Sequence, residues 1–286
     1  MRTILIDSNH YCHRAKHTTG DLSTEEFATG IMFGFLMQIL KDSERLESNK
    51  LVFFWDSQKS IRKDKYPFYK KKRIEKKKEL TEEEQHLETL AYKQFTMLRR
   101  TVLPEIGFRN NFVQPGFEAD DLMAKFVCYR DYLDCVMATA DNDMWQCLEL
   151  CDIYHPSLKK MITKESFMKE YGIIPGSWEQ VKEIAGCGTD GVPGVYNVGN
   201  ATAIKYLNGT LPKHHKTYKD ITSEEGKKIA KRNRWLVSLP IPGTKLFPMR
   251  KDRFSVPAFI RICKKYEFDS FLKREWLDRW KTFLST

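Results

Sequence analysis

Three short apolar runs, each followed at once by an aspartate, constrain the fold of this chain more than any other feature. The runs are Thr3 to Ile6, Leu51 to Trp55 and Cys135 to Ala140, and the aspartates are Asp7, Asp56 and Asp141. Short apolar runs of this kind predict buried strands, and helical patterns at Phe27 to Leu40 and Glu118 to Tyr129 separate them. Strands that alternate with helices predict a parallel α/β sheet.

Acidic residues gather where such a sheet would bind a ligand. The carboxyl ends of parallel strands share one edge, so the three aspartates are expected to converge. Two more acidic segments, 118–121 (EADD) and 141–143 (DND), lie at the starts of predicted helices. Acidic residues also suit the first turn of a helix, so either segment alone is compatible with simple capping. Together they predict a cleft of five or more carboxylates, which would repel one another unless cations neutralise them.

The composition of this predicted cleft indicates which cations it would bind. Oxygen ligands without histidine favour Mg²⁺ or Mn²⁺ over zinc. Two such ions can flank a scissile phosphate, one activating the attacking water and the other stabilising the leaving oxygen.

One basic segment carries nearly all of the net charge of +10. Between Lys59 and Lys78, eleven basic residues stand against two acidic ones, which gives this segment a net charge of +9. Such a cluster predicts a polyanionic partner, and Tyr66, Phe68 and Tyr69 lie among the cations where nucleic-acid bases could stack. A solvated basic helix face is the alternative for a charge run alone. A nuclease accounts for both features, because cations hold the DNA backbone while metal ions mask the carboxylates.

Composition excludes several other classes of protein. With 41% hydrophobic and 30% charged residues the chain is not disordered. The longest nearly apolar stretch, Gly30 to Leu40, is too short to span a membrane, and the N-terminus lacks a signal-like segment, so we expect a cytoplasmic protein. Seven cysteines without a CxxC pair argue against a zinc ribbon or a disulfide framework.

With these residues laid out, the sequence resembles the 5′ nuclease family, which includes flap endonucleases, the 5′ nuclease domain of bacterial DNA polymerase I and bacteriophage 5′ exonucleases. The elements that carry the resemblance occur in family order: Asp7, Asp56, residues 66–73 (YPFYKKKR), 118–121 (EADD), 141–143 (DND), 186–195 (GCGTDGVPGV) and 198–203 (VGNATA). The resemblance implies a PIN-like parallel-sheet nuclease domain over residues 1–164, with a basic helical arch at about 59–100. It implies a helical duplex-DNA-binding lobe over 165–286, with a helix-hairpin-helix-like (helix-three-turn-helix) motif.

The same resemblance implies a set of site residues. The metal ligands would be Asp7, Asp56, Glu118 and Asp120 for a first Mg²⁺ and Asp141, Asp143 and Asp190 for a second, with Asp121 acting directly or through water. Lys70 and Arg73 would contact the scissile phosphate and offset its developing charge. The nucleic-acid-binding residues would be Arg62, Lys63, Tyr69, Lys71 and Lys72 in the arch and Gly194, Val198, Gly199, Asn200 and Thr202 in the hairpin motif. The resemblance also implies that Mn²⁺ would substitute for Mg²⁺ and that the hairpin motif would hold a K⁺ ion, as it often does in the family.

Two residues depart from the family pattern. Asn197 replaces the first glycine of the hairpin turn, a mild change because asparagine tolerates left-handed backbone conformations. Cys187 stands where the family usually has an aspartate near the second metal. Because a thiol is a poor ligand for magnesium, Cys187 in the second-metal shell would weaken that site. The alternative is that Cys187 only packs in the turn.

The resemblance implies a monomeric, structure-specific 5′ nuclease with 5′-3′ exonuclease and flap endonuclease activity. It would act in DNA replication, primer removal or repair, on DNA with a 5′ end, flap or branch and on RNA primers. One alternative is a structure-specific DNA-binding protein with weakened catalysis, which Cys187 supports. Another is a PIN-type ribonuclease, which the hairpin motif and the long basic arch disfavour.

Overall fold

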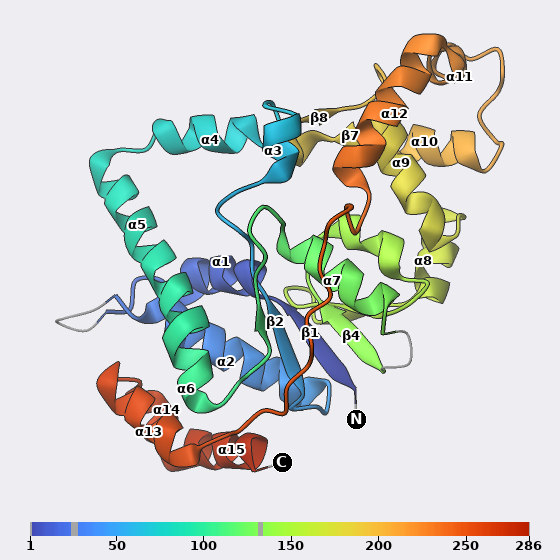
Figure 1. The fold of residues 1–286 in the computed structure, drawn as a ribbon. Helices are drawn as coiled ribbons and strands as arrows, with labels where there is room; N and C mark the ends of the chain where they lie inside the picture. The colour runs from blue at the N-terminus through green and yellow to red at the C-terminus, as the bar shows by residue number, and fades with distance from the viewer. Residues whose placement is uncertain (1, 24–27, 131–133, 286) are drawn as a thin grey trace.

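A six-stranded sheet lies at the centre of the computed structural model, which describes residues 2–23, 28–130 and 134–285 (Figure 1). The strands are β1 (Thr3–Asp7), β2 (Leu51–Phe54), β3 (Asn111–Phe112), β4 (Cys135–Ala138), β5 (Asp152–His155) and β6 (Lys160–Ile162). Their order is β3-β2-β1-β4-β5-β6, and β6 runs antiparallel to β5 while the other neighbours pair in parallel. The predicted parallel α/β sheet is therefore confirmed, with the three predicted strands at its centre.

Helices cover both faces of the sheet, which is why β1 is buried along its whole length. Side chains alternate along the strand, so that Ile4 and Ile6 face one core and Leu5 the other. The first face is covered by α1 (Ser8–Thr19), α2 (Gly30–Arg45), α13 (Val256–Lys265), α14 (Asp269–Leu272) and α15 (Arg274–Leu284). The second face is covered by α7 (Ala119–Cys128) and α9 (Trp178–Ala185). The helix predicted at 27–40 is α2, and its predicted first residue, Phe27, lies outside the described residues.

The predicted arch region is helical and stands at one side of the sheet (Figure 1). Its elements are α3 (Ile61–Lys65), α4 (Lys71–Lys78), α5 (Glu82–Met97), a π-helical turn (Leu98–Val102) and α6 (Leu103–Ile106). No side chain of α4 is buried, as expected for a helix of sequence KKRIEKKK. By contrast, α5 begins with a capping box between Thr81 and Glu84 and is anchored near its end, where the Gln94 side chain accepts hydrogen bonds from the first turn of α2.

The second half of the chain adds a group of helices beside the sheet and then returns to it. The elements are α8 (Lys164–Tyr171), β7 (Gly186–Cys187), β8 (Val192–Pro193), α10 (Asn200–Leu207), α11 (Lys216–Thr222), α12 (Glu224–Val237) and the 3-10 turns Asn142–Cys147, Pro175–Ser177 and Gly188–Asp190. Helix α12 packs along α9, whereas Phe259 of α13 and Trp280 of α15 share the core of β1. The lobe boundary at residue 164 stays a prediction, but packing places residues 256–284 with the sheet. Within the described ranges no helix has the length and apolar character needed to cross a bilayer.

Candidate metal centre and nucleic-acid interface

Three strand-end aspartates meet at one edge of the sheet. Asp7 is the last residue of β1, and Asp56 and Asp141 lie just beyond the carboxyl ends of the adjacent strands β2 and β4. The Thr139 hydroxyl donates to Asp7 Oδ2 at 3.0 Å, which joins the ends of β1 and β4. The Asp56 side chain accepts the N–H of Ala119 at 2.8 Å, which ties β2 to the first turn of α7. The parallel sheet thus brings the carboxylates of distant segments together.

Crowding shifts the protonation of these carboxylates. Burial and the charge of Asp56 raise the pKa of Asp7 to about 7. Burial and the charge of Asp143 raise the pKa of Asp141 to about 6. The pKa of Asp120 lies well above its usual range, through burial and then the charges of Asp141 and Asp7. Because a nearby cation favours the ionised form, this group of acids is chemically suited to divalent ions.

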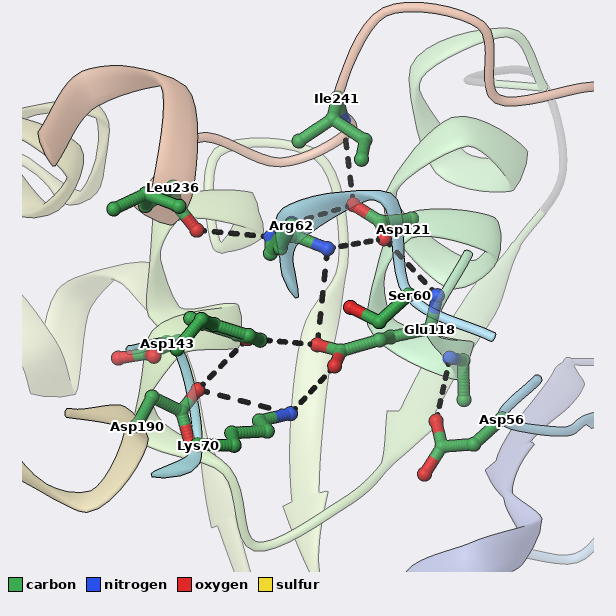
Figure 2. Close-up of polar contacts among 12 residues, drawn as sticks. Asp56, Ser60, Arg62, Lys70, Glu118, Asp121, Asp143, Asp190, Leu236 and Ile241 are labelled. Atoms are coloured by element: carbon green, nitrogen blue, oxygen red, sulfur yellow. Dashed lines mark hydrogen bonds and ion pairs between the residues drawn. The ribbon is translucent and has the colours of Figure 1, made fainter. Parts of the chain in front are cut away.

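Glu118 differs from these acids because protein cations already surround it (Figure 2). Lys70 Nζ donates to its Oε1 at 2.7 Å, and Arg62 Nη1 lies 3.7 Å from its Oε2. Burial alone would raise the pKa of Glu118, but Lys70 and Arg62 outweigh burial and hold that pKa below its usual value. Glu118 is therefore ionised at neutral pH.

Of the two residues predicted to contact the scissile phosphate, Lys70 lies between Glu118 and Asp190, and Arg73 pairs with Asp190. Arg73 donates to Asp190 Oδ1 at 2.7 Å, and Lys70 Nζ lies 3.8 Å from Asp190 Oδ2. The Lys70 backbone, in a left-handed conformation with φ of 55°, donates its N–H to the Asp190 carbonyl at 2.7 Å. The Tyr69 hydroxyl lies 3.0 Å from both Glu118 Oε2 and Asp190 Oδ2. The structure therefore brings Lys70 and Arg73 to the acidic cluster.

A second candidate metal group contains the unusual cysteine. One ligand atom each from Asp143, Cys187 and Asp190 can be chosen so that all three lie within 4.8 Å of one another. Cys187 Sγ is 3.6 Å from Asp143 Oδ2 and 3.1 Å from Thr189 Oγ1. This geometry is compatible with Cys187 lining the second site, but Cys187 also packs in a small apolar cluster with Tyr69 and Leu236, so its role stays a prediction.

Lys182 on α9 also reaches this group, and sequence reasoning missed it. Its ammonium lies 2.7 Å from Asp143 Oδ1 and donates to Asn142 Oδ1 at 3.1 Å, although the residue is only 4% exposed. The sequence could have indicated a buried Lys182, because this lysine lies among the apolar residues Trp178, Val181 and Ile184 of a short amphipathic helix. A lysine on a buried helix face requires an acidic partner.

An open cleft of about 1110 Å³ lies between the arch and the acidic edge. Asp56 and Glu118 line it on the sheet side, and Arg73 and Lys77 line it on the side of α4. Tyr92 of α5 also contributes to the wall. A polyanion that entered this cleft would have both carboxylates and compensating cations within reach.

Two predicted roles, those of Arg62 and Asp121, are wrong. Arg62 forms a bidentate ion pair with Asp121, with distances of 2.6 and 2.8 Å, and also donates to the Leu236 carbonyl at 2.9 Å (Figure 2). The two charged residues are 2% and 0% exposed. The Asp121 oxygens also accept the backbone N–H groups of Glu118 and Ile241. From this buried position Arg62 is not placed to contact nucleic acid, and the Asp121 oxygens are occupied by Arg62 and by backbone N–H groups, so Asp121 is a structural partner of Arg62.

Tyr69 is also misassigned as a nucleic-acid contact. The side chain is 2% exposed and packs beside Cys187 and Leu236, with its hydroxyl directed at the carboxylates. Of the other predicted arch contacts, Lys71 and Lys72 are exposed and Lys63 is half-buried, so these three remain available to a polyanion.

The hairpin motif combines a tight turn with an uncapped helix start. Gly194 is required by packing, because a Cβ there would lie 2.1 Å from the Ala185 carbonyl oxygen. Asn197 adopts the predicted left-handed conformation with φ of 56°. Val198 is buried and its N–H is bonded to the Val195 carbonyl, so its amide is already used.

The start of α10 offers the better phosphate contact. Gly199 is the N-cap of α10 and has no side chain to satisfy the first-turn N–H groups. Asn200 and Thr202, both half-buried, belong to that first turn. The uncapped helix start is compatible with the anion contact that the motif predicts, which stays a prediction, although the Thr202 N–H already bonds to the Gly199 carbonyl at 3.0 Å.

Comparisons with known proteins agree with this fold. The family model for the 5′-3′ exonuclease N-terminal resolvase-like domain matches residues 2–172. A 5′-3′ exonuclease of Buchnera aphidicola is 25% identical over 278 residues, 92% of this chain and 92% of that protein. The thermostable DNA polymerase I of Thermus aquaticus is 27% identical over 210 residues, 72% of this chain. The chain spans about a quarter of the length of such polymerases, with 24% of the Thermus protein aligned.

Solved structures show the same fold at low sequence identity. The T5 5′-exonuclease with bound zinc ions has a TM-score of 0.71 and 19% identity, over 84% of this chain and 90% of that one. A T5 flap endonuclease pseudo-enzyme–product complex with DNA and metal ions has a TM-score of 0.70 and 19% identity, over 98% of this chain and 99% of that one. Because the family model covers more than half of its residues, the chain belongs to the 5′-3′ exonuclease family.

Proposed function

We propose that this chain is a divalent-metal-dependent 5′ nuclease that hydrolyses DNA phosphodiester bonds as a 5′-3′ exonuclease and flap endonuclease. One observation carries the proposal: the strand-end carboxylates, Lys70 and Arg73 converge beside a cleft that the cationic helix α4 also lines. A binding protein needs the cations alone. The uncompensated acids Asp7, Asp120 and Asp141 have a use only if metal ions bind there.

The donor set supports two metal sites of unequal quality. Asp7, Asp56, Glu118 and Asp120 would hold the first Mg²⁺, and Asp141, Asp143 and Asp190 the second, with Cys187 at its margin. Bound there, the ions would lower the pKa of the attacking water and stabilise the leaving oxygen, and Mn²⁺ would substitute for Mg²⁺. The first set is composed of oxygen ligands, as magnesium prefers. The second set has a thiol and a competing ammonium from Lys182, so it fits a hard ion less well.

Lys70 and Arg73 would act on the phosphate itself. Both now pair with carboxylates, and both lie at the cleft wall. A phosphate oxygen that replaced Asp190 as partner would be held by the Arg73 guanidinium, and Lys70 would place a point charge beside it. These contacts would stabilise charge as it develops on the phosphate.

The remaining contacts would position the substrate. Lys63, Lys71 and Lys72 would attract the backbone of a 5′ single strand, and residues Gly194 to Thr202 would hold the duplex through the start of α10, with a K⁺ ion in the hairpin. We propose action on 5′ ends, flaps and branches in replication, primer removal or repair, including on RNA primers, by a cytoplasmic monomer.

A 5′-labelled flap substrate tests this function directly. Incubation with Mg²⁺ or Mn²⁺ should release short labelled products, and EDTA should abolish them. Matched flaps of DNA and RNA separate the proposed enzyme from a PIN-type ribonuclease, which would cut only the RNA. Absence of metal-dependent products above background from every substrate would refute nuclease function.

A second candidate function has its own observation. Cys187 and Lys182 both reduce the negative charge available to a second metal ion, which suits a structure-specific DNA-binding protein with weakened cutting. Such a protein would bind flaps as tightly as the nuclease, but single-turnover cleavage with saturating Mg²⁺ would stay at background.

A further inference from the structure

Three aromatic side chains from two distant segments gather on the surface beside the candidate site. Phe68 is 57% exposed, and Tyr66 and Trp235 are half-buried. The Tyr66 and Phe68 rings lie 5.9 Å apart with an interplanar angle of 62°. Tyr66 and Trp235 pack against the same small core, although Trp235 comes from α12. In Figure 1, α3 and the end of α12 meet next to β7 and β8.

Each of these rings has a cation over its face. Lys65 Nζ lies 4.0 Å from the Trp235 ring centroid, and Lys71 Nζ lies 5.2 Å from that of Phe68. The Arg232 guanidinium lies 5.6 Å from the Tyr66 ring. Aromatic faces interleaved with cations suit single-stranded nucleic acid, because bases stack on the rings while the cations hold the phosphates. A purely packing role does not explain a phenylalanine that leaves more than half of its surface in water.

The backbone fixes this aromatic surface relative to the acidic cluster. A Cβ on Gly191 would lie 2.9 Å from the Phe68 carbonyl oxygen, so the two loops are in close contact. Two residues later, the Lys70 N–H bonds the Asp190 carbonyl at 2.7 Å. Tyr66 and Trp235 also share their core with Cys187. A base on Phe68 would therefore be held at a defined distance from the metal site.

We propose that Phe68, Tyr66 and Trp235 form a stacking platform for unpaired bases of single-stranded DNA, immediately next to the cutting site. This assignment rests on the proposed function, since it names the part of the nuclease substrate that the surface holds. Phe68 supplies the open ring face, Tyr66 packs beside it, and Trp235 extends the apolar surface. Lys65 and Lys71 are exposed and can turn to the phosphates, whereas Arg232 is held in place by hydrogen bonds to the buried Asn233 side chain.

An abasic-site scan tests stacking separately from charge. Flaps that lack one base at a time across the junction keep every phosphate but remove one stacking partner. Binding of the full chain is measured by fluorescence anisotropy in EDTA, so the result does not depend on cleavage. Phe68→Ala should bind the intact flap about tenfold more weakly, equivalent to about 1.4 kcal/mol. Against the flap that lacks the stacked base, wild type and Phe68→Ala should bind equally, and Phe68→Trp should retain wild-type affinity for intact DNA.

Tyr129 offers a matched control within the chain. It is 59% exposed with Lys125 Nζ 3.7 Å from its ring, but it lies at the opposite end of α7 from Glu118. Tyr129→Ala should bind all flaps like wild type. The platform is refuted if Phe68→Ala binds intact DNA as wild type does, or if it loses the same affinity for every abasic flap. If the protein shows the stacking pattern but never cuts DNA, the stacking proposal stands and the proposed nuclease function is refuted.

Discussion

Replacing Cys187 by aspartate tests how the second metal site is built. The thiol lies 3.6 Å from Asp143 Oδ2 and belongs to the group in which ligand atoms of Asp143, Cys187 and Asp190 lie within 4.8 Å of one another. The new carboxylate would add one negative charge to a site that now has Asp143 and Asp190, with Lys182 as the nearest cation to Asp143. The substitution therefore restores the residue that the family pattern predicts.

The size of the effect follows from the short distances. Two unit charges roughly 4 Å apart interact by about 4 kcal/mol at an effective dielectric constant of about 20. In the metal-free protein the added carboxylate is repelled by Asp143, whereas a divalent ion is attracted to both. Desolvation cancels much of this gain, because Cys187 is only 7% exposed. We expect the Mg²⁺ concentration for half-maximal cleavage to fall about tenfold to a hundredfold, equivalent to about 1.4 to 2.8 kcal/mol.

Three measurements check this expectation. Metal titration of single-turnover cleavage gives the Mg²⁺ requirement, calorimetry gives Mn²⁺ affinity without DNA, and thermal unfolding compares metal-free and metal-bound protein. Cys187→Asp should unfold at a lower temperature than wild type without metal and recover with Mg²⁺. Cys187→Ser should behave like wild type, since a neutral oxygen adds no charge. An unchanged Mg²⁺ requirement in a folded Cys187→Asp protein would show that this position is outside the second site.

Other variants test the remaining assignments. Asp141→Asn should abolish cutting while fluorescence anisotropy shows equal or tighter DNA binding, because a metal ligand and a repulsive charge are lost together. If the variant still cuts, Asp141 is not part of the metal site. Lys70→Ala should slow single-turnover cleavage by about 10²-fold with little loss of DNA affinity. Lys77→Ala should mainly weaken DNA binding and lower the salt dependence of binding by about one ion. A catalytic role for Lys70 would be refuted if both variants lost the same amount of DNA affinity and nothing else. Arg62→Met should destabilise the fold by about 3 to 5 kcal/mol in urea unfolding because Asp121 is left buried and unpaired, and Arg62→Met with Asp121→Leu should recover much of that loss.

The sequence predicts the centre of this fold well because local pattern and tertiary burial agree there. Apolar runs such as Thr3 to Ile6 are buried on both faces, so their composition alone indicates strands. The edge strands are different. β3 has two residues and β5 has the mixed sequence Asp152–His155, so neither shows a clear pattern of apolar residues in the sequence. Only pairing with a neighbouring strand defines them.

The adjacent aspartates of the EADD segment show where sequence reasoning fails. Asp120 and Asp121 are both in the first turn of α7, and a helix turns about 100° per residue, so one can face the acidic cluster only if the other does not. What selects between them is Arg62, 59 residues earlier, whose buried guanidinium needs Asp121. The Arg62 and Asp121 assignments failed together because the sequence contains no sign of that contact.

Protein cations neutralise the carboxylates of the site unevenly, and this unevenness affects how tightly each metal ion binds. Glu118 and Asp190 are paired with Lys70 or Arg73, and Asp143 is paired with Lys182. In the described part of the chain Asp7 and Asp141 form no ion pair, and their pKa values are raised to about 7 and about 6. In the set proposed for the first ion only Glu118 is paired with a protein cation, whereas in the set proposed for the second ion Asp143 and Asp190 are both paired with cations that a metal ion must displace. The first ion should therefore bind more tightly than the second, and substrate phosphate, by drawing Lys70 and Arg73 away from Asp190, would itself help to open the weaker site.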